Sequence, residues 1–249
     1  MKKTKFAVLL TAFMAVLGLS SCLGEPDPFY TAQEIMKVER GYLGIGYTFE
    51  SSAGYSVEPT NSSMFTSDIN SAYALVTYKY DTRTTVFDPN SEKASPVEIQ
   101  YLLPISEIRM GYENMEPNAA MYKVSETVKF YDEYNIFMDL TYSYKSSKDQ
   151  EDLKEELAKH SFYLTKATAE NDEDVNDNTM VLNLIHQVAD PENNKDRNEW
   201  GTELRHFDLS YVLQGTKPEK IIIKFKQNSS SIDLGDNVRD SQIEINYKE

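Results

Sequence analysis

The chain has 249 residues, of which 40% are hydrophobic and 26% charged, with only 10 Gly and 9 Pro. This length and composition exclude a disulfide-stapled mini-protein and a broadly disordered chain, because there is enough apolar material to bury a core. The 40 Asp and Glu outnumber the 25 Lys and Arg, which gives a formal net charge of −15. Such a charge repels phosphate backbones, and no local basic stripe offsets it, so nucleic acid is not expected as a partner.

The first 21 residues have the pattern of a signal peptide. Lys2, Lys3 and Lys5 form a basic head, and residues 6–19 form an apolar run too short for a membrane span. The run ends in Leu-Ser-Ser-Cys, which resembles the bacterial lipobox, in which the cysteine receives diacylglycerol before the peptidase cuts in front of it. We therefore expect lipidation at Cys22 and an outer-membrane lipoprotein of the cell envelope, held to the membrane by this anchor.

Residues 22–34 predict a flexible tether, because Pro26 and Pro28 lie in a stretch without periodicity. The acidic residues that follow Cys22 resemble the surface-export signal of Bacteroidetes lipoproteins, and both the periplasmic and the surface-exposed orientation stay open. Cys22 is also the only cysteine. A disulfide and a Cys-based metal site are therefore excluded in the monomer.

Residues 35–118 predict a small OB-like β-barrel. Four strand candidates lie in this segment, at residues 35–40, 41–50, 72–80 and 97–103. Gly41, Gly44 and Gly46 fall where a strand must bend sharply, and so few short strands suit a five-stranded barrel better than a sandwich. The segment 111–120 has no apolar alternation, so the domain boundary is expected there.

Residues 119–249 predict an antiparallel β-sandwich. From Tyr134 to Tyr144 every even position is apolar, which is the period of a strand with one buried face. The same alternation recurs in five further stretches, at residues 122–130, 180–184, 207–211, 221–225 and 243–247. Only residues 148–159 predict a helix, which is short and highly charged. The fold class is therefore all-β, a small OB-like barrel followed by an antiparallel β-sandwich.

One segment offers a candidate metal site. Asp172, Asp174 and Asn176 have the alternate oxygen spacing of a calcium loop. The match then fails, because Asp177 stands where that loop needs a glycine and Asn183 stands where it needs a bidentate glutamate. A solvated acidic hairpin loop is therefore the favoured interpretation, and calcium the alternative.

The sequence contains no catalytic signature. His160, His186 and His206 have no partner histidine at i+2 or i+4, so we expect packed or hydrogen-bonded histidines rather than metal ligands. A Gly-x-Ser-x-Gly motif, a Gly-rich phosphate loop and a Cys-His pair are all missing, so neither an enzyme nor a cofactor is expected. Most of the 17 tyrosines fall on the apolar side of strands. The remaining aromatic residues are expected to be exposed over residues 41–55 or on the odd face near Phe137.

The C-terminal half contains a series of motifs in a fixed order. These are YNIFMDLTYSY, HSFYLTKAT, an Asp-rich loop, MVLNLIHQVADPENN, EWGTELRHFDLS, KPEKIIIKFK and SQIEINY. In this order, and in the Trp-then-Phe-Asp-Leu-Ser element, the chain resembles the NigD-like lipoproteins of Bacteroidetes. The resemblance implies an N-terminal OB-like barrel joined to a C-terminal β-sandwich. It implies no enzymatic activity, and bacteriocin immunity only by analogy with the gene that names the family.

Together these features predict a non-catalytic envelope lipoprotein that acts as a binding or interaction module for a protein or peptide. A lipid-anchored all-β module with variable loops is a common form for binding proteins. Two alternatives stay open, a glycan-binding accessory lipoprotein and a fimbrial or structural surface component. The fimbrial alternative needs an open groove or a donated edge strand, and residues 243–247 are the candidate strand.

Overall fold

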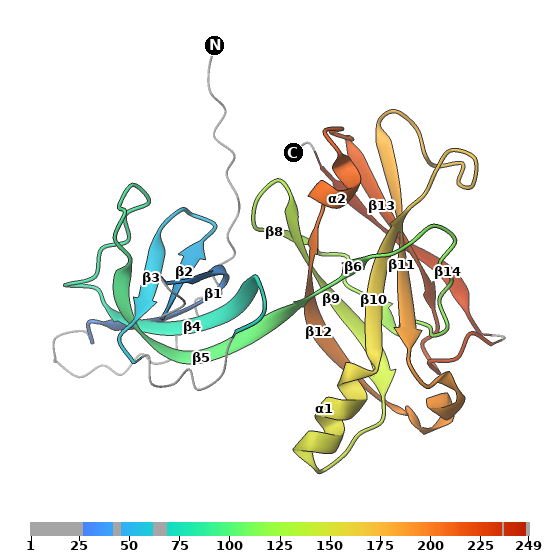
Figure 1. The fold of residues 1–249 in the computed structure, drawn as a ribbon, viewed down its shortest axis with the longest axis horizontal. Helices are drawn as coiled ribbons and strands as arrows, with labels where there is room; N and C mark the ends of the chain where they lie inside the picture. Colours follow the sequence, from blue (N-terminus) through green and yellow to red (C-terminus); the bar gives the residue numbers. More distant parts are fainter. Residues whose placement is uncertain (1–26, 42–45, 62–68, 236, 248–249) are drawn as a thin grey trace. The chain divides into compact units, whose positions relative to one another are not determined.

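The computed structural model describes residues 27–41, 46–61, 69–235 and 237–247. The predicted signal peptide, the lipidation site Cys22 and Gly44 lie outside these ranges. Half of the chain is strand and 9% is helix, so the all-β prediction is confirmed. The chain divides into two compact units, residues 1–105 and 106–249 (Figure 1). No helix among the described residues is long and apolar enough to cross a membrane.

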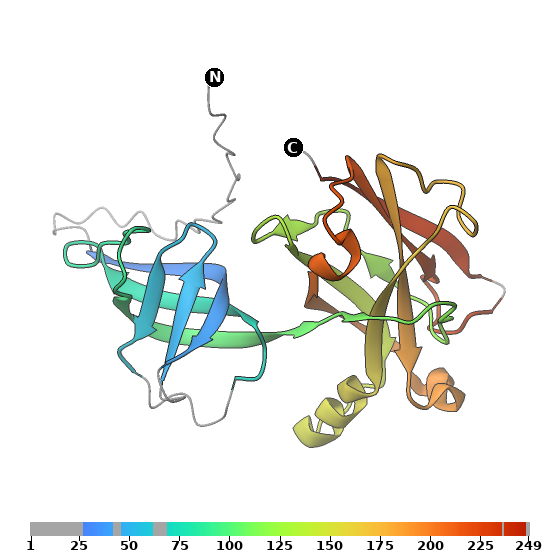
Figure 2. The same ribbon diagram turned by 45° about the horizontal axis from the view of Figure 1, so that its top comes forward.

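The first unit is a closed five-stranded barrel, as the sequence predicts (Figures 1 and 2). Its strands are β1 (Phe29–Arg40), β2 (Tyr47–Ser51), β3 (Ser56–Pro59), β4 (Tyr73–Asp81) and β5 (Ser95–Glu107). β1 pairs antiparallel with β2 and β4, β2 with β3, and β4 with β5. A parallel pairing of β3 with β5 closes the barrel. Its core contains Met36, Phe49, Val57, Val76 and Ile99.

The first strand begins earlier than the sequence predicts. Residues 29–34 belong to β1 rather than to the tether, because they pair antiparallel with the end of β4, from Phe29 opposite Asp81 onward. The strand start does not alternate between buried and exposed side chains, since the neighbouring Phe29 and Tyr30 are both exposed. The pairing with β4 extends the strand to Phe29, although only Ala32 and Glu34 in this segment are partly buried.

The predicted boundary within 111–120 also shifts, because the compact units divide between Ile105 and Ser106. The segment 111–120 belongs to the second unit, where Met115, Ala119 and Ala120 are buried. Its missing alternation reflects an irregular segment anchored by these three buried side chains, and not a linker.

The second unit is a β-sandwich of two sheets. Its strands are β6 (Arg109–Met110), β7 (Lys123–Val124), β8 (Lys129–Phe130), β9 (Asn135–Tyr144), β10 (His160–Lys166), β11 (Thr179–Val188), β12 (Glu199–Asp208), β13 (Lys220–Gln227) and β14 (Arg239–Asn246). In one sheet β12 lies between β9 and the end of β5, and β7 and β8 both pair with β9. The other sheet has the order β14-β13-β11-β10-β6. The helices are α1 (Gln150–Ala158), the 3-10 turn η3 (Pro191–Asp196) and α2 (Ser210–Leu213).

The sandwich is mixed rather than purely antiparallel, which corrects one part of the prediction. β11 and β13 run parallel because the chain crosses to the other sheet as β12 before it returns. Short parallel pairings also join β6 to β10 and the end of β5 to β12. β14 pairs antiparallel with β13 from Arg239 to Asn246, so the strand candidate 243–247 belongs to the edge strand of a sheet in its own chain and is not donated.

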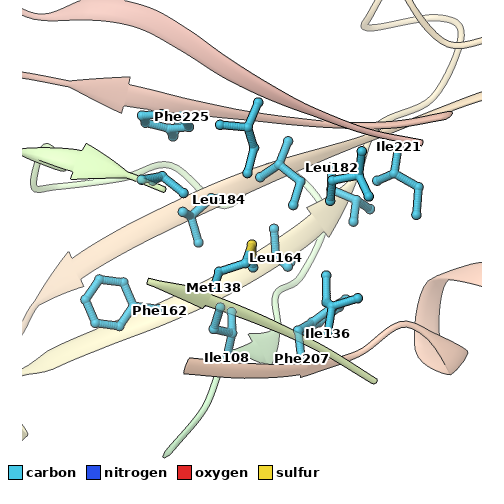
Figure 3. Packing of buried hydrophobic residues seen from close by; sticks show 14 of the residues in the cluster. Ile108, Ile136, Met138, Phe162, Leu164, Leu182, Leu184, Phe207, Ile221 and Phe225 are labelled. Atoms are coloured by element: carbon cyan, nitrogen blue, oxygen red, sulfur yellow. The ribbon is translucent and has the colours of Figure 1, made fainter. Parts of the chain in front are cut away.

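The two sheets pack through apolar side chains that point toward one another (Figure 3). Ile136, Met138 and Leu140 occupy even positions of β9, and each is fully buried, as the alternation predicts. Burial of each such side chain contributes roughly 1.5–3 kcal/mol. Phe137, on the odd face of β9, is only 1% exposed, so the exposed aromatic surface expected there is not found at Phe137 itself.

Candidate functional site

A small charged cavity lies in the second unit between α1 and η3. Its volume is about 150 Å³, and its lining residues are Lys145, Glu156, Lys159, Asp190, Asn193, Asp196 and Arg197. Titratable groups gathered around a hollow are the usual signature of a functional site. The geometry of these groups therefore decides what the cavity can do.

Helix α1 places Glu156 in this cavity. The helix begins after Asp149, whose carboxylate accepts hydrogen bonds from the backbone N–H groups of Glu151 and Asp152, an N-cap that satisfies two orphan donors. About two helical turns after the cap, Glu156 turns inward and is only 6% exposed. Its Oε1 accepts a hydrogen bond from the backbone N–H of Lys145 at 3.2 Å.

Arg197 is the centre of the cluster and its side chain is 1% exposed. Its Nε donates to Glu156 Oε1 at 2.7 Å, and its Nη2 donates to Glu156 Oε2 at 3.4 Å and to the carboxylate of Asp190. Its Nη1 donates to the backbone carbonyl of Asp190 at 3.1 Å and to Asn194 Oδ1 at 3.0 Å. All five N–H donors of the guanidinium are thus used within the chain, so Arg197 clamps α1 to η3 and holds no donor for an anionic ligand.

Two carboxylates of the cluster, Glu156 and Asp190, are held in their ionised form. Burial raises the pKa of Glu156, but the hydrogen bond from Arg197 and the backbone N–H of Lys145 outweigh it, so the pKa lies below its usual value. For Asp190, burial is likewise outweighed by hydrogen bonds from Lys159 and Arg197, which lower its pKa. Lys159 Nζ lies 3.0 Å from Asp190 Oδ2 and 3.4 Å from Glu156 Oε2. With Lys145 Nζ 3.7 Å from Asp196 Oδ2, the three cations of the lining balance its three carboxylates.

A buried histidine pair adjoins this cluster. His160 Nδ1 lies 3.0 Å from His186 Nε2, and His186 Nδ1 lies 3.2 Å from the carbonyl oxygen of Ala120. Because a carbonyl can only accept, His186 carries its proton on Nδ1 and accepts a hydrogen bond from His160 Nδ1. His160 Nε2 then presents a lone pair, buried without a hydrogen-bond partner, 3.5 Å from Glu156 Oε1.

Burial keeps both histidines neutral. It lowers the pKa of His160 to about 4 and the pKa of His186 to about 3. Aromatic rings enclose the pair, since Tyr142 lies 4.6 Å from His160 and Phe162 stacks on His186 at 4.7 Å between ring centroids. The arrangement is an enclosed hydrogen-bonded network that joins β10 to β11.

The third histidine is hydrogen-bonded as well. His206 Nε2 lies 2.8 Å from Asn135 Oδ1, and burial lowers its pKa to about 4. Each histidine is therefore packed and hydrogen-bonded, as expected from the sequence. Two of them nevertheless form a pair that no sequence spacing indicates, because β10 and β11 bring together residues that are 26 positions apart.

The predicted calcium loop contains a cation of its own. Lys224 Nζ lies 2.8 Å from both carboxylate oxygens of Asp172 and 2.7 Å from Asp174 Oδ2. The third candidate ligand, Asn176, uses its Oδ1 to accept the backbone N–H of Asn178. Among the described residues no group of three or more His, Cys, Asp or Glu side chains is arranged to hold a metal ion. The geometry thus favours the solvated hairpin loop over calcium.

The outer face of the β12–β9–β7 sheet carries an exposed aromatic pair. Trp200 is 59% exposed, and its ring stacks on that of Tyr122 with centroids 5.2 Å apart and planes 7° from parallel. Trp200 lies opposite Ser143 on β9, and the N–H of Tyr122 bonds to the carbonyl of Thr141 on the same strand. We call Trp200 and Tyr122 the aromatic patch. Sequence analysis missed it, because the two residues meet only across a sheet.

Comparisons with known proteins indicate the kind of fold. No family model and no curated protein matches the chain. A Bacteroides fragilis protein described as a candidate lipoprotein has a similar solved structure, with a TM-score of 0.68, 23% identity, and coverage of 88% of this chain and 99% of that chain. The solved structure of a candidate toxin-related protein from Parabacteroides distasonis is also similar, with a TM-score of 0.53 and 12% identity. The match covers 88% of this chain and 95% of that chain.

A third similar structure is that of a NigD-like immunity protein from Bacteroides caccae, with a TM-score of 0.51 and 14% identity over 84% of this chain and 91% of that chain. At these identities the likeness is one of fold. The resemblance to NigD-like lipoproteins that the sequence indicates is therefore confirmed at that level. The chain has the all-β, barrel-and-sandwich fold of NigD-like proteins of the Bacteroidetes.

Proposed function

We propose that this chain is a non-catalytic lipoprotein of the cell envelope that binds a protein or peptide partner. The observation that carries this proposal is the aromatic patch on the second unit. Trp and Tyr are enriched at the energetic centres of protein interfaces, where one large ring supplies much of the binding free energy. An exposed Trp stacked on a neighbouring ring is the group in this chain best suited to that role.

The patch is rigid before any partner arrives. Trp200 stands on β12, which pairs with β9 through ten consecutive residues, and the parallel ring of Tyr122 restricts its rotation. On the same face, two positions along β12, the hydroxyls of Thr202 and Thr141 bond to each other at 2.8 Å. A preorganised ring loses little conformational entropy on binding.

Two of the similar structures support a protein partner rather than a small molecule. One is described as a NigD-like immunity protein and another as toxin related. By analogy, this chain would recognise a bacteriocin-like protein in the envelope. The patch also favours a glycan as the second candidate ligand, but glycan platforms usually present several exposed aromatic rings, and this one presents a single stacked pair.

The proposal is tested by capture with the purified full chain in detergent, from envelope extracts and on a glycan array. We expect the Trp200→Ala variant to capture at least about tenfold less of a protein partner, in line with an interface centre. Tyr211→Ala is the matched control, because Tyr211 is 53% exposed on α2, outside the patch. Equal capture by both variants contradicts the proposal, and a Trp200-dependent glycan signal moves the glycan candidate ahead.

We further propose that acylation of Cys22 holds the protein at the outer membrane. The two or three acyl chains that lipobox processing adds make a stable anchor, whereas one chain binds reversibly. Replacement Cys22→Ser should move the protein from the membrane fraction to the soluble fraction of fractionated cells. Persistence of Cys22→Ser in the membrane fraction would refute the anchor.

A further inference from the structure

We propose that the free edge of β14, with the groove beside it, accepts an extended peptide segment that alternates apolar and basic residues. The segment would add to the sheet as a further strand. This inference rests on the proposed binding function and names a second contact surface and the chemistry of its partner. It concerns residues 126–130 and β14, which are separate from the aromatic patch.

The outer edge of β14 is open. β14 is the terminal strand of its sheet and pairs only with β13 (Figure 1). The N–H of Tyr247 bonds to the carbonyl of Glu219 at 2.8 Å, which fixes the alternation of the antiparallel ladder. The backbone N–H and C=O groups of Gln242 and Glu244 therefore point away from β13, and within the described residues they make no hydrogen bond.

A groove runs along this edge. It has a volume of about 310 Å³, and its lining residues are Glu126, Thr127, Val128, Phe130, Glu244, Ile245 and Asn246. Val128 and Phe130 are half-buried, and together with Ile245 they form an apolar floor. The groove is bounded near Asn246 by Tyr247, whose ring lies 6.3 Å from that of Phe130 and whose hydroxyl donates to the carbonyl of Glu133. Side chains on one face of an added strand would fill this space.

β13, the strand that already pairs with β14, shows which kinds of side chain pack beside each face of β14. β13 places Ile221 and Ile223 toward the core and Lys220 and Lys226 on the outer face. Lys220 Nζ lies 3.3 Å from Glu244 Oε2, and Lys226 Nζ lies 2.7 Å from Asp240 Oδ1. A strand added to the opposite edge would meet the same two carboxylates across the ladder, where opposite charges stabilise a pair.

The groove also has an acidic rim on its other side. Glu126 is exposed and makes no ion pair with any described residue. Asp240 and Glu244 pair with Lys226 and Lys220 of β13, but their side chains stay 83% and 51% exposed on the outer face of β14. The net charge of −15 favours a cationic segment at longer range. Backbone hydrogen bonds would give affinity, and the alternation of apolar and basic residues would give specificity.

The test uses a blocked peptide of about nine residues that alternates Val and Lys, long enough to span β14. Its Kd for the full chain in detergent is measured by fluorescence anisotropy beside that of a Val-Glu counterpart. Gln242→Pro removes one outward N–H without touching the β13 ladder, and Gln242→Thr retains it at the same charge. We expect Gln242→Pro to weaken binding at least about tenfold and Gln242→Thr to leave the Kd within about twofold.

Amide hydrogen exchange gives a second readout, because strand addition forms backbone hydrogen bonds that slow exchange, whereas a contact between side-chain charges alone does not. The bound peptide should slow exchange of the amides of Gln242 and Glu244, which point outward. If Gln242→Pro does not fold, Glu126→Lys replaces it, because Glu126 lies off the strand, and the Kd of the basic peptide should rise at least about fivefold.

Several outcomes overturn the inference. These are equal Kd values for Gln242→Pro and Gln242→Thr, preference for the acidic peptide, or no binding of the basic peptide. Binding that is lost in Trp200→Ala and retained in Gln242→Pro assigns the peptide to the aromatic patch instead. If the basic peptide fails to bind while Trp200-dependent capture from envelope extracts persists, this inference falls and the proposed function stands.

Discussion

Arg197 gives the charged cluster its geometry, because one guanidinium joins the end of α1 to η3 through Glu156, Asp190 and Asn194. A buried ion pair adds little stability compared with two well-packed apolar side chains in its place, because both ions lose their hydration. Removing only one partner leaves a buried charge unpaired, which is strongly destabilising. The cluster therefore specifies how α1 lies against η3 more than it adds net stability. A variant that removes only one partner should expose this asymmetry.

We expect Arg197→Met to lower the free energy of unfolding by about 3–5 kcal/mol, since it leaves Glu156 buried and ionised without its main partner. Replacing both Arg197 and Glu156 with Met should recover most of that loss. Guanidinium denaturation followed by far-ultraviolet circular dichroism measures both values. A double variant as unstable as the single one would show that Arg197 acts mainly through Asp190 and Asn194.

Lys224 determines how the acidic loop responds to calcium. Its ammonium lies between Asp172 and Asp174, both within 2.8 Å, so a calcium ion would have to displace it. We expect about 5 mM calcium to leave the thermal midpoint of the wild-type protein unchanged, a concentration at which even weak extracellular calcium modules are occupied. We expect Lys224→Met to lower the free energy of unfolding by at most about 1 kcal/mol, as for a partly exposed ion pair. A calcium-dependent rise in the wild-type midpoint would restore the calcium interpretation.

At the scale of elements, the sequence predicted strands well wherever one face is buried. The alternation in 134–144 corresponds to β9, and the charged segment 148–159 corresponds to α1. Strands whose existence depends on pairing alone were harder to predict, as with the first residues of β1. The stretch 122–130 forms two short strands, β7 and β8, on the same neighbour.

The candidate sites were less predictable than the strands. His160 and His186, Glu156 and Arg197, and Tyr122 and Trp200 are each far apart in the sequence and meet only through tertiary pairing. Metal and catalytic motifs have fixed spacings because their ligands share one element, and these pairs do not. Composition and periodicity therefore indicate the fold, whereas the sites depend on which strands become neighbours.

The histidine pair between β10 and β11 makes stability depend on pH. His160, His186 and His206 have folded pKa values of about 4, about 3 and about 4, below the 6.5 of the unfolded chain. The unfolded state therefore takes up protons first as the pH falls. The stability contributed by neutral histidines is fully present above pH 6.5 and is lost progressively toward pH 4. The lowered pKa of Glu156 acts at lower pH, below its usual value of 4.5.

Between pH 6.5 and 4.5 we thus expect the free energy of unfolding to fall by up to about 1.4 kcal/mol per pH unit for each histidine. Denaturant titrations at several pH values measure this slope. His206→Gln removes one of the three groups and should reduce the slope by about a third, while the buried pair stays intact. A flat profile in this window would mean that the histidines keep ordinary pKa values in the folded chain.

For the molecule as a whole, the net charge follows directly from the amino-acid composition. The net charge is −15, and removal of Lys2, Lys3 and Lys5 with the signal peptide would make it more negative. Among the described residues, ion pairs such as Lys37 with Glu50 and Lys217 with Glu133 are exposed. Exposed pairs contribute little, and salt screens them together with the general repulsion between carboxylates.

The repulsion between carboxylates should affect stability more than the exposed ion pairs do, because 15 acidic charges have no basic counterpart. Salt shortens the range of that repulsion, with a Debye length of about 10 Å at 0.1 M. The buried pair of Arg197 with Glu156 is screened much less than surface charges and retains its contribution. We therefore expect the thermal midpoint to rise by about 2–4 °C when NaCl increases from about 0.01 M to 0.2 M, which corresponds to about 1 kcal/mol for a chain of this size. Scanning calorimetry of the full chain in detergent measures the shift, and a lower midpoint at high salt would show that the surface ion pairs outweigh the repulsion.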